Sequence, residues 1–226
     1  MEKKYLEILS RTLLFRSIPA AETEAILAAL GAEEKTYARG EVILHAGDVT
    51  DAIALVLAGS VLVESNDWWG NKSILDRPGP GQVFAETYAC APGQPLLVSA
   101  VAAEPASILF LHAGALLRGD GIPAAQQLLR NLLTVFSRKN LHLSRRMFHT
   151  APRSIRRRVQ LFLSDQAMFS GAQEFDIPFD RQQLADYLNT DRSALSAELS
   201  RMQKEGLLTV RKNHFRLLSG GETAER

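Results

Sequence analysis

The spacing of hydrophobic positions changes three times along the chain. Residues 5–32 have helical spacing in "YLEILSRTLLF" and "PAAETEAILAALG", with Pro19 near the start of the second helix and Gly31 at its end. Residues 33–112 carry short runs of Val, Ile, Leu and Thr cut by glycines, which is typical of a β-sandwich or barrel. The expected strands lie in "EVILHAGD", "AIALVLAGSVLVES", "KSILDRPGPGQVF", "LLVSAVAA" and "ASILFL".

Helical spacing returns over residues 123–149. The apolar stripe steps by 3, 4, 7 and 4 residues through Leu129, Leu132, Phe136, Leu143 and Met147. These steps approximate a heptad seam, in which Lys139 stands where another apolar residue is expected. A narrow stripe of this kind favours a partner helix. The alternative is that it packs on the β domain of its own chain.

The most informative stretch is "DRQQLADYLNTDRSALSAELSRMQKEGLL", residues 180–208. Asp180 and Gln183 form a capping-box pair, so a helix is predicted from about Arg181, and Leu184, Ala185 and Leu188 form its buried face. Asn189 and Thr190 interrupt it. A second helix is predicted from about Asp191 to Glu205, ended by Gly206 and burying Leu195, Leu199 and Met202. Two short helices joined by a tight turn indicate a helix-turn-helix. The alternative is a small structural bundle.

The second of these helices presents polar residues near its N-terminal end. Arg192 is the strongest base-reading candidate, because a guanidinium can pair bidentately with guanine. Ser193 and Ser196 lie beside it. Arg181 and Gln182 open the first helix and are candidates for phosphate contacts. The segment "LLTVRKNHFRLL" predicts a two-stranded wing with Arg211 and Lys212 at its tip.

Charge is unevenly placed in this chain of 226 residues with a net charge of +1. Residues 121–164 hold nine Lys or Arg and no acid, whereas residues 1–120 carry a net charge of −6. Such a basic belt indicates an anionic partner, of which nucleic acid is the commonest, or else a solvated helix face.

Composition also limits location and chemistry. The longest nearly apolar run, residues 52–63, is too short to span a bilayer, and the N-terminus lacks a secretory pattern, so we expect no membrane association. The single cysteine, Cys90, excludes an intramolecular disulfide, so a cytoplasmic location is expected.

Motifs of catalysis are missing from the sequence. It has no P-loop, nucleophile elbow or Cys-x-x-Cys, and residues 33–112 contain only His45 and His112, without the clustered ligands of a cupin-type metal site. The remaining histidines, His142, His149 and His214, form no evident haem-ligand pair with them. We therefore predict a protein that is not an enzyme and that has no metal or other cofactor.

The order of β-rich domain, long helix and winged helix-turn-helix resembles the Crp/Fnr superfamily of bacterial transcription regulators over nearly the whole chain. The segments "ARGEVILHAGD", "ALVLAGSVLV" and "GQVFAETYACAPGQPLLVSAVAA" look like its effector domain, and residues 180–208 are similar to its helix-turn-helix. The resemblance implies an α+β fold with a jelly-roll-like β-roll domain over 1–122, a dimerisation helix over 123–149 and a DNA-binding domain over 150–226. It also implies a homodimer on a near-palindromic double-stranded DNA site, with RNA polymerase as a further partner.

Two departures from the family pattern narrow this expectation. In cyclic-nucleotide-binding members a glutamate precedes an Arg–Ser or Arg–Thr pair that holds the cyclic phosphate. Here Glu86 matches the glutamate, but Leu96 and Leu97 stand in place of that pair, so cAMP is not the expected effector. In the recognition helix, Ser193 and Ala197 replace the Glu and the second Arg of the best-known member, so a different half-site is expected.

The expected effector is instead an unknown small molecule of apolar or aromatic character. Its candidate pocket is lined by Phe84, Glu86, Tyr88, Leu96, Leu97, Lys139 and Leu143. Lys139 could hold a phenolate or carboxylate, or could be a solvated break in the seam. Cys90 is either a packing residue or a thiol switch. Trp68 and Trp69 are placed at a β-hairpin tip. The alternative function is a degenerate family member that binds a ligand or partner without specific DNA reading.

Overall fold

The computed structural model describes residues 3–66, 72–118, 121 and 124–218. The hairpin tip expected at Trp68 and Trp69 lies outside these residues. The chain forms two compact units, Met1–Arg138 and Lys139–Arg226, and each is described by itself. The long helix α5 (Ala125–Thr150) contributes residues to both.

Two four-stranded antiparallel sheets form the β-roll of the first unit, after helices α1 (Lys3–Arg11) and α2 (Ala20–Ala29). One sheet has the order β1-β8-β3-β6, and the other has the order β2-β7-β4-β5. The strands are β1 (Glu33–Tyr37), β2 (Val42–Leu44), β3 (Ala52–Ala58), β4 (Val61–Asn66), β5 (Lys72–Asp76), β6 (Val83–Phe84), β7 (Ser99–Ala102) and β8 (Ala106–His112). Two short helices, α3 (Glu86–Ala89) and α4 (Ala113–Arg118), follow β6 and β8.

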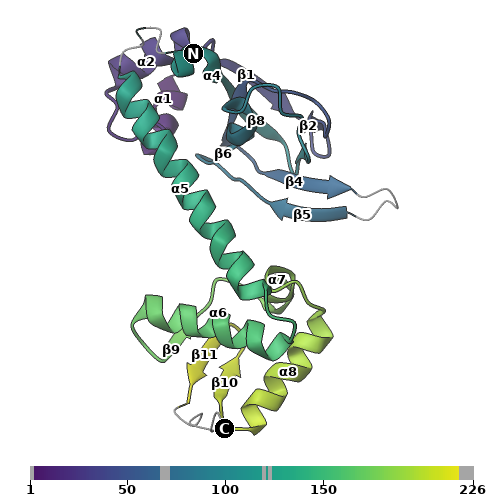
Figure 1. Ribbon diagram of the computed structural model, residues 1–226. Coiled ribbons are helices and arrows are strands. Elements are labelled where there is room, and N and C mark those ends of the chain that lie inside the picture. Colours follow the sequence, from purple (N-terminus) through teal and green to yellow (C-terminus); the bar gives the residue numbers. More distant parts are fainter. Residues whose placement is uncertain (1–2, 67–71, 119–120, 122–123, 219–226) are drawn as a thin grey trace. The chain divides into compact units, whose positions relative to one another are not determined.

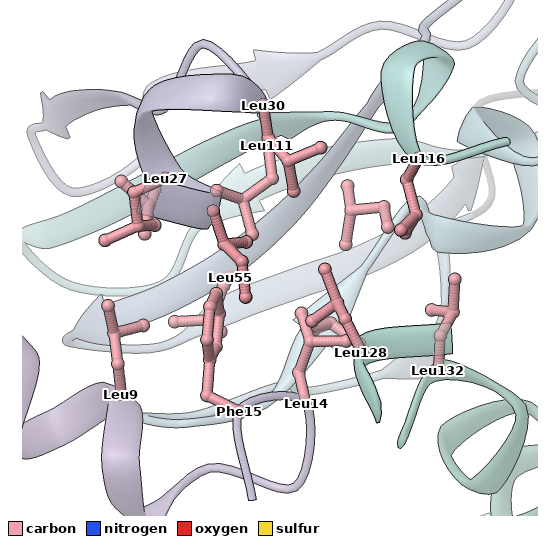
Figure 2. Packing of buried hydrophobic residues seen from close by; sticks show 14 of the residues in the cluster. Leu9, Leu14, Phe15, Leu27, Leu30, Leu55, Leu111, Leu116, Leu128 and Leu132 are labelled. Atoms are coloured by element: carbon pink, nitrogen blue, oxygen red, sulfur yellow. The ribbon is translucent and has the colours of Figure 1, made fainter. Parts of the chain in front are cut away.

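Strands β3 and β8 are buried on both faces, which explains their nearly continuous apolar sequences. Their alternate residues Ala54, Val56 and Ile108 fill the interior of the roll. Leu55 and Leu111 face the opposite way. There they pack with Leu9, Leu27 and Leu128 of helices α1, α2 and α5 and with Phe15 of the turn after α1, as Figure 2 shows.

The turn between β3 and β4 depends on Gly59. Its φ is +76°, and a Cβ atom there would lie 2.4 Å from the carbonyl oxygen of Pro105. No side chain fits at that distance, so glycine lets this turn pack directly on the residues that begin β8.

The second unit combines the end of α5 with α6 (Ile155–Ser170), a helix-turn-helix and a small sheet (Figure 1). The helices of the motif are α7 (Arg181–Tyr187) and α8 (Arg192–Lys204). Strands β9 (Glu174–Asp176), β10 (Leu208–Arg211) and β11 (His214–Leu217) form an antiparallel sheet in the order β10-β11-β9. Val159, Phe162, Leu184, Leu195 and Phe215 are among the residues that form the core of this unit.

The predicted α+β architecture is confirmed, and the helix boundaries of the C-terminal motif agree with the capping prediction. Four elements were not predicted: β1, β9, α3 and α4. The sequences of β1 and β9, "EEKTY" and "EFD", are short and mostly polar, so they carry too little alternation to be recognised.

Helix α5 carries two apolar stripes rather than the single predicted one. Leu128, Leu132 and Val135 are buried in the core of the first unit, whereas Leu133 and Leu143 are 64% and 62% exposed. The assignment of Leu132 to a seam for a partner helix is therefore wrong. For this residue the alternative holds, because it packs on its own chain.

Candidate nucleic-acid interface and effector segment

The start of α7 has the predicted capping box. The Asp180 carboxylate accepts a hydrogen bond from the Gln183 backbone N–H at 2.8 Å, and the Gln183 side-chain oxygen accepts one from the Asp180 N–H at 2.8 Å. These bonds satisfy donors that a helix start otherwise leaves unpaired, so they fix where α7 begins.

The turn between the two helices is held by an arginine from α6. Arg158 donates through Nη1 to the carbonyl oxygens of Leu188 and Asn189, at 3.1 and 2.8 Å, and through Nε to that of Pro152 at 2.6 Å. Asn189 has a φ of +52°, a left-handed conformation that asparagine adopts more readily than most residues. A cation at the C-terminal end of α7 also complements the helix dipole.

The end of α5 is hydrogen-bonded to the C-terminal end of α7. Arg146 donates to the carbonyl oxygens of Asp186 and Tyr187 at 3.2 and 3.4 Å. His149 is 1% exposed, and its Nδ1 lies 3.0 Å from the Tyr187 hydroxyl, while its Nε2 lies 3.4 Å from Asp165 of α6. Burial lowers the pKa of His149, and the Asp165 carboxylate opposes this effect. The last turns of α5 are thus built into the second unit.

Helix α8 begins at an N-cap that uses one of the predicted contact residues. The Asp191 carboxylate accepts hydrogen bonds from the backbone N–H groups of Ser193 and Ala194, and also from the Ser193 hydroxyl. These bonds lower the pKa of Asp191, the Ser193 hydroxyl contributing most. The Ser193 hydroxyl is therefore engaged within the protein.

Arg192 is exposed at the start of α8, as predicted for a base-reading side chain. It lies close enough to Arg181 for its charge, after the larger effect of burial, to lower the pKa of Arg181. The Arg181 guanidinium lies 6.0 Å from the Phe215 ring centre and 3.5 Å from the Lys212 carbonyl oxygen. Two neighbouring cations favour an anionic ligand at this end of the motif.

The other predicted contact residues differ in how they are engaged. Gln182 is exposed and donates to the Asp186 carboxylate at 2.8 Å. Ser196 is half-buried, and its carbonyl accepts a hydrogen bond from the Ser200 hydroxyl. Arg211 and Lys212 are exposed at the turn of the wing, where Lys212 has a φ of +58°.

A charged cluster that sequence reasoning missed joins α6 to α8. Glu198 is 7% exposed, and its carboxylate accepts a hydrogen bond from Arg156 Nε at 2.6 Å. The same guanidinium donates two bonds of 2.7 Å to Glu205, which raises the pKa of Arg156 and lowers that of Glu205. Glu198 and Arg156 are 42 residues apart, so no local spacing could have indicated the pair.

In the first unit, the candidate effector residues lie at the end of β6 and in the segment that follows it. Phe84 and Glu86 are each 3% exposed, and Ala85 between them has a φ of +59°. Leu96 is 4% exposed, and its backbone bonds to Gly47 and Asp48 at 2.8 Å. Tyr88 accepts a hydrogen bond at its hydroxyl from the Leu97 N–H, while the Leu97 side chain is 78% exposed. The structure thus brings Phe84, Glu86, Tyr88 and Leu96 into one segment of the roll, with Leu97 at its surface.

The remaining effector candidates belong to the second unit. Lys139 is half-buried and Leu143 is exposed. A pocket that combines them with the residues of the roll stays a prediction. Cys90 is half-buried, and burial, followed by the charge of Glu86, raises the pKa of its thiol. A thiol held protonated is a poor redox nucleophile, so this environment favours the packing role.

Neither a metal site nor a membrane span is found in the described part of the chain. No cluster of three or more His, Cys, Asp or Glu residues capable of holding a metal occurs there. None of its helices is both long and apolar enough to cross a membrane.

Comparison with known proteins gives two domain matches. A profile described as a cyclic nucleotide-binding domain matches residues 34–118, and one described as a Crp-like helix-turn-helix domain matches residues 157–219. No curated protein sequence matches the chain.

Several solved structures share the fold. The catabolite activator protein of Thermus thermophilus is 24% identical, with a TM-score of 0.51 and coverage of 91% of this chain and 93% of that one. The c-di-GMP responsive regulator CLP of Xanthomonas campestris is 20% identical, with a TM-score of 0.59 and coverage of 89% and 100%. CprK complexed with OCPA is 14% identical, with a TM-score of 0.65 and coverage of 89% and 93%.

Proposed function

Because the chain belongs to the Crp/Fnr superfamily of bacterial transcription regulators, we propose that it acts as a homodimeric, sequence-specific DNA-binding regulator controlled by a small molecule other than cAMP. The observation that carries DNA binding is the exposed Arg192 at the start of α8, beside the cation of Arg181. Helix α8 corresponds to the helix that such motifs insert into the major groove.

The proposed division of labour follows from the contacts of each residue. Arg192 reads a guanine, whereas Arg181, Lys212 and Arg211 bind phosphates and set the position of the motif on DNA. Ser196 is a secondary candidate because it is half-buried, and Gln182 reaches a phosphate after leaving Asp186. The Ser193 hydroxyl stabilises the helix start through Asp191.

The test is selection of bound fragments from random double-stranded DNA. We expect a near-palindrome with half-sites about one helical turn apart. Arg192→Ala should relax the preference at one base pair per half-site, a loss of about 1–3 kcal/mol for each contact. Lys212→Ala is the matched control: it should weaken binding to all sequences alike and reduce the salt dependence by about one unit of slope.

Sequence-indifferent binding that Arg192→Ala leaves unchanged would contradict this function. That result would favour the alternative, a family member that binds a ligand or partner without reading DNA.

We exclude cAMP as the effector because of Leu96. This side chain is 4% exposed and stands where cyclic-nucleotide-binding members place the arginine of the phosphate clamp. A phosphate buried there would lack a compensating cation, which costs several kcal/mol in a low-dielectric site. The fold does not dictate the ligand, since CLP is described as c-di-GMP responsive and CprK was solved with OCPA.

A thermal-shift series tests the effector proposal. cAMP should leave the melting temperature unchanged at physiological concentration, whereas a true effector raises it with increasing concentration. The screen should include phenols, short carboxylic acids, cyclic nucleotides and haem. A concentration-dependent shift with cAMP would overturn the exclusion.

The proposal assigns no catalytic step and no cofactor to the chain. RNA polymerase as a partner and a cytoplasmic location stay predictions.

A further inference from the structure

The small sheet of the second unit has an apolar face and a charged face. Its strands lie in the order β10-β11-β9, as Figure 1 shows, and Phe215 of β11 stands directly opposite both Val210 and Phe175. Phe175 and Phe215 are buried in the core of the unit. Because side chains alternate along a strand, the residues next to these three point to the opposite face.

That opposite face carries charged side chains in two rows. In the first row, His214 of β11 stands directly opposite Arg211 of β10 and Asp176 of β9. In the next row, Glu174 stands opposite Arg216. Side chains that are directly opposite in antiparallel strands lie close together on one face of a sheet. His214 is therefore surrounded by two carboxylates from β9 and by one arginine each from β10 and β11.

The ring of His214 joins the two carboxylates. Its Nδ1 lies 2.9 Å from Asp176 Oδ1, and its Nε2 lies 2.9 Å from Glu174 Oε1. A carboxylate oxygen can only accept, so both contacts are hydrogen bonds only when both ring nitrogens carry a proton. The arrangement therefore fits the imidazolium form, and the two bonds, that to Glu174 first, raise the pKa of His214.

Loss of the proton changes both the charge and the hydrogen bonding of this face. A neutral imidazole donates through one nitrogen only, so one carboxylate loses its donor and the face becomes more negative by one charge. Glu174 keeps another cation nearby, because Arg216 Nε lies 3.9 Å from its Oε2. Asp176 instead shares its row with Arg211. Asp176 is thus the carboxylate that gains a reason to pair with Arg211.

Arg211 is exposed beside the turn of the wing and is one of the residues that we assign to DNA phosphates. Strand β11 separates it from Asp176, so the two backbones lie about 10 Å apart, a gap that both side chains can close together. A carboxylate paired with Arg211 competes with a phosphate for the same guanidinium. The neighbouring cations Lys212 and Arg181, whose guanidinium donates to the Lys212 carbonyl oxygen, stay charged over the range in which histidine titrates.

We propose that His214 is a proton-dependent positioning residue of the wing. The protonated ring holds both carboxylates and leaves Arg211 available to a DNA phosphate, whereas the neutral ring releases Asp176 to pair with Arg211. DNA binding therefore weakens as the pH rises through the titration of His214. The inference rests on the DNA binding of the proposed function and adds to it a response to protons near neutral pH.

The affinity of the full chain for a fluorescent double-stranded DNA of mixed sequence tests this response. Mixed sequence suffices because contacts to phosphates do not depend on the bases. At constant ionic strength, the chain should bind several-fold more weakly at pH ~8.5 than at pH ~6. The salt dependence should also fall at the higher pH, by about one unit of slope for each wing, since one phosphate contact is lost.

Two substitutions of His214 separate its charge from its packing. His214→Arg keeps donors for both carboxylates at every pH, so it should bind DNA at the higher pH as tightly as the unaltered chain does at the lower pH. His214→Gln carries no charge and should bind weakly at both. His45→Gln changes an exposed histidine of the first unit, and this control should keep the pH response of the unaltered chain.

Further variants identify the competing pair. Asp176→Asn should abolish the loss of affinity at the higher pH, because it removes the competing charge, whereas Glu174→Gln should reduce that loss less. Arg211→Ala should weaken binding at the lower pH but have little effect at the higher pH, where Asp176 already engages Arg211. A merely structural role of these residues in the wing would give effects that do not depend on pH in this way.

A pH response that survives His214→Gln, or an affinity that does not change between the two pH values, would overturn the inference. An equal effect of Arg211→Ala at both pH values would overturn it as well. Fragment selection reads the DNA function separately. An Arg192-dependent site recovered from a chain without the pH response would leave the proposed DNA reading in place and reject only this inference.

Discussion

Two histidines of the second unit respond to protons in opposite directions. Burial lowers the pKa of His149, so the unfolded chain binds that proton more tightly than the folded chain. The stability that neutral His149 contributes to the fold is therefore complete above pH ~6.5. It is lost as the pH falls below this value toward the lower pKa of the folded state. His214 lies 2.9 Å from both Glu174 and Asp176, and these bonds raise its pKa. The stability that protonated His214 contributes to the fold is complete below pH ~6.5, and it is lost as the pH rises through the folded-state pKa of His214.

We predict opposite effects of His149→Gln and His214→Gln on the pH profile of unfolding. His149→Gln should diminish the loss of stability between pH 7.5 and pH 5.5, and His214→Gln should enlarge it. Urea midpoints measured at about these two pH values for both variants provide the check, each variant being the control for the other. Parallel profiles for the two variants would contradict the assignment.

Sequence predicted residue roles well where the role is local. The capping box of Asp180 and Gln183 and the buried face formed by Leu184, Ala185 and Leu188 need only neighbours within one helix, and both are confirmed. The engagement of Ser193 by Asp191 is also local, but it competes with the DNA contact that the same residue type suggests. The pairing of Arg156 with Glu198 joins two helices and could not be predicted from spacing.

At the scale of the element, the end of α7 is held by arginines from two other helices. Arg158 of α6 and Arg146 of α5 bind the carbonyls of residues 186–189. Carbonyls at the end of a helix lack an intrahelical donor, so removal of Arg158 takes away the charged donor of Leu188 and Asn189, whereas the Asp186 carbonyl also accepts from the Asn189 N–H at 3.2 Å. The turn of the helix-turn-helix is therefore stabilised from outside the motif.

Arg158→Met tests this support. It should lower the free energy of unfolding of the second unit by about 2 kcal/mol, the typical loss for hydrogen bonds to a charged group. Denaturant unfolding followed by circular dichroism measures the change. Arg157→Met, at an exposed neighbouring position of α6, is the control and should have a much smaller effect. Equal effects of both variants would show that the carbonyl contacts contribute little.

Elements were predictable when they had both a period and a boundary residue. Helices α7 and α8 have capping residues at their starts, and β3 and β8 have long apolar runs. β9 has neither a hydrophobic period nor a boundary residue. Its position in the sheet depends instead on pairing with β11, some 40 residues later. For α5 the period was recognised but its two stripes were merged, since Leu132 and Leu133 are both leucines and only packing distinguishes them.

At the scale of the whole molecule, the chain consists of two units with separate cores. Leu55 is fully buried in the first core and Leu195 in the second. Since neither side chain contributes to the other core, a cavity at one of them destabilises chiefly its own unit.

We predict that Leu55→Ala and Leu195→Ala each cost about 2–5 kcal/mol, but in different parts of the chain. Amide hydrogen exchange should show increased opening of β3 and β8 in the first variant and of α7 and α8 in the second. Uniform loss of protection over the whole chain in either variant would indicate a single cooperative unit instead.

The one-residue offset between the two stripes of α5 has a consequence for genetics. Neighbouring positions such as Leu132 and Leu133 would fall into different phenotypic classes: substitutions at the first reduce the amount of folded protein, whereas substitutions at the second leave it abundant and inactive. Defects along this helix would therefore alternate between the two classes with a period of about seven residues.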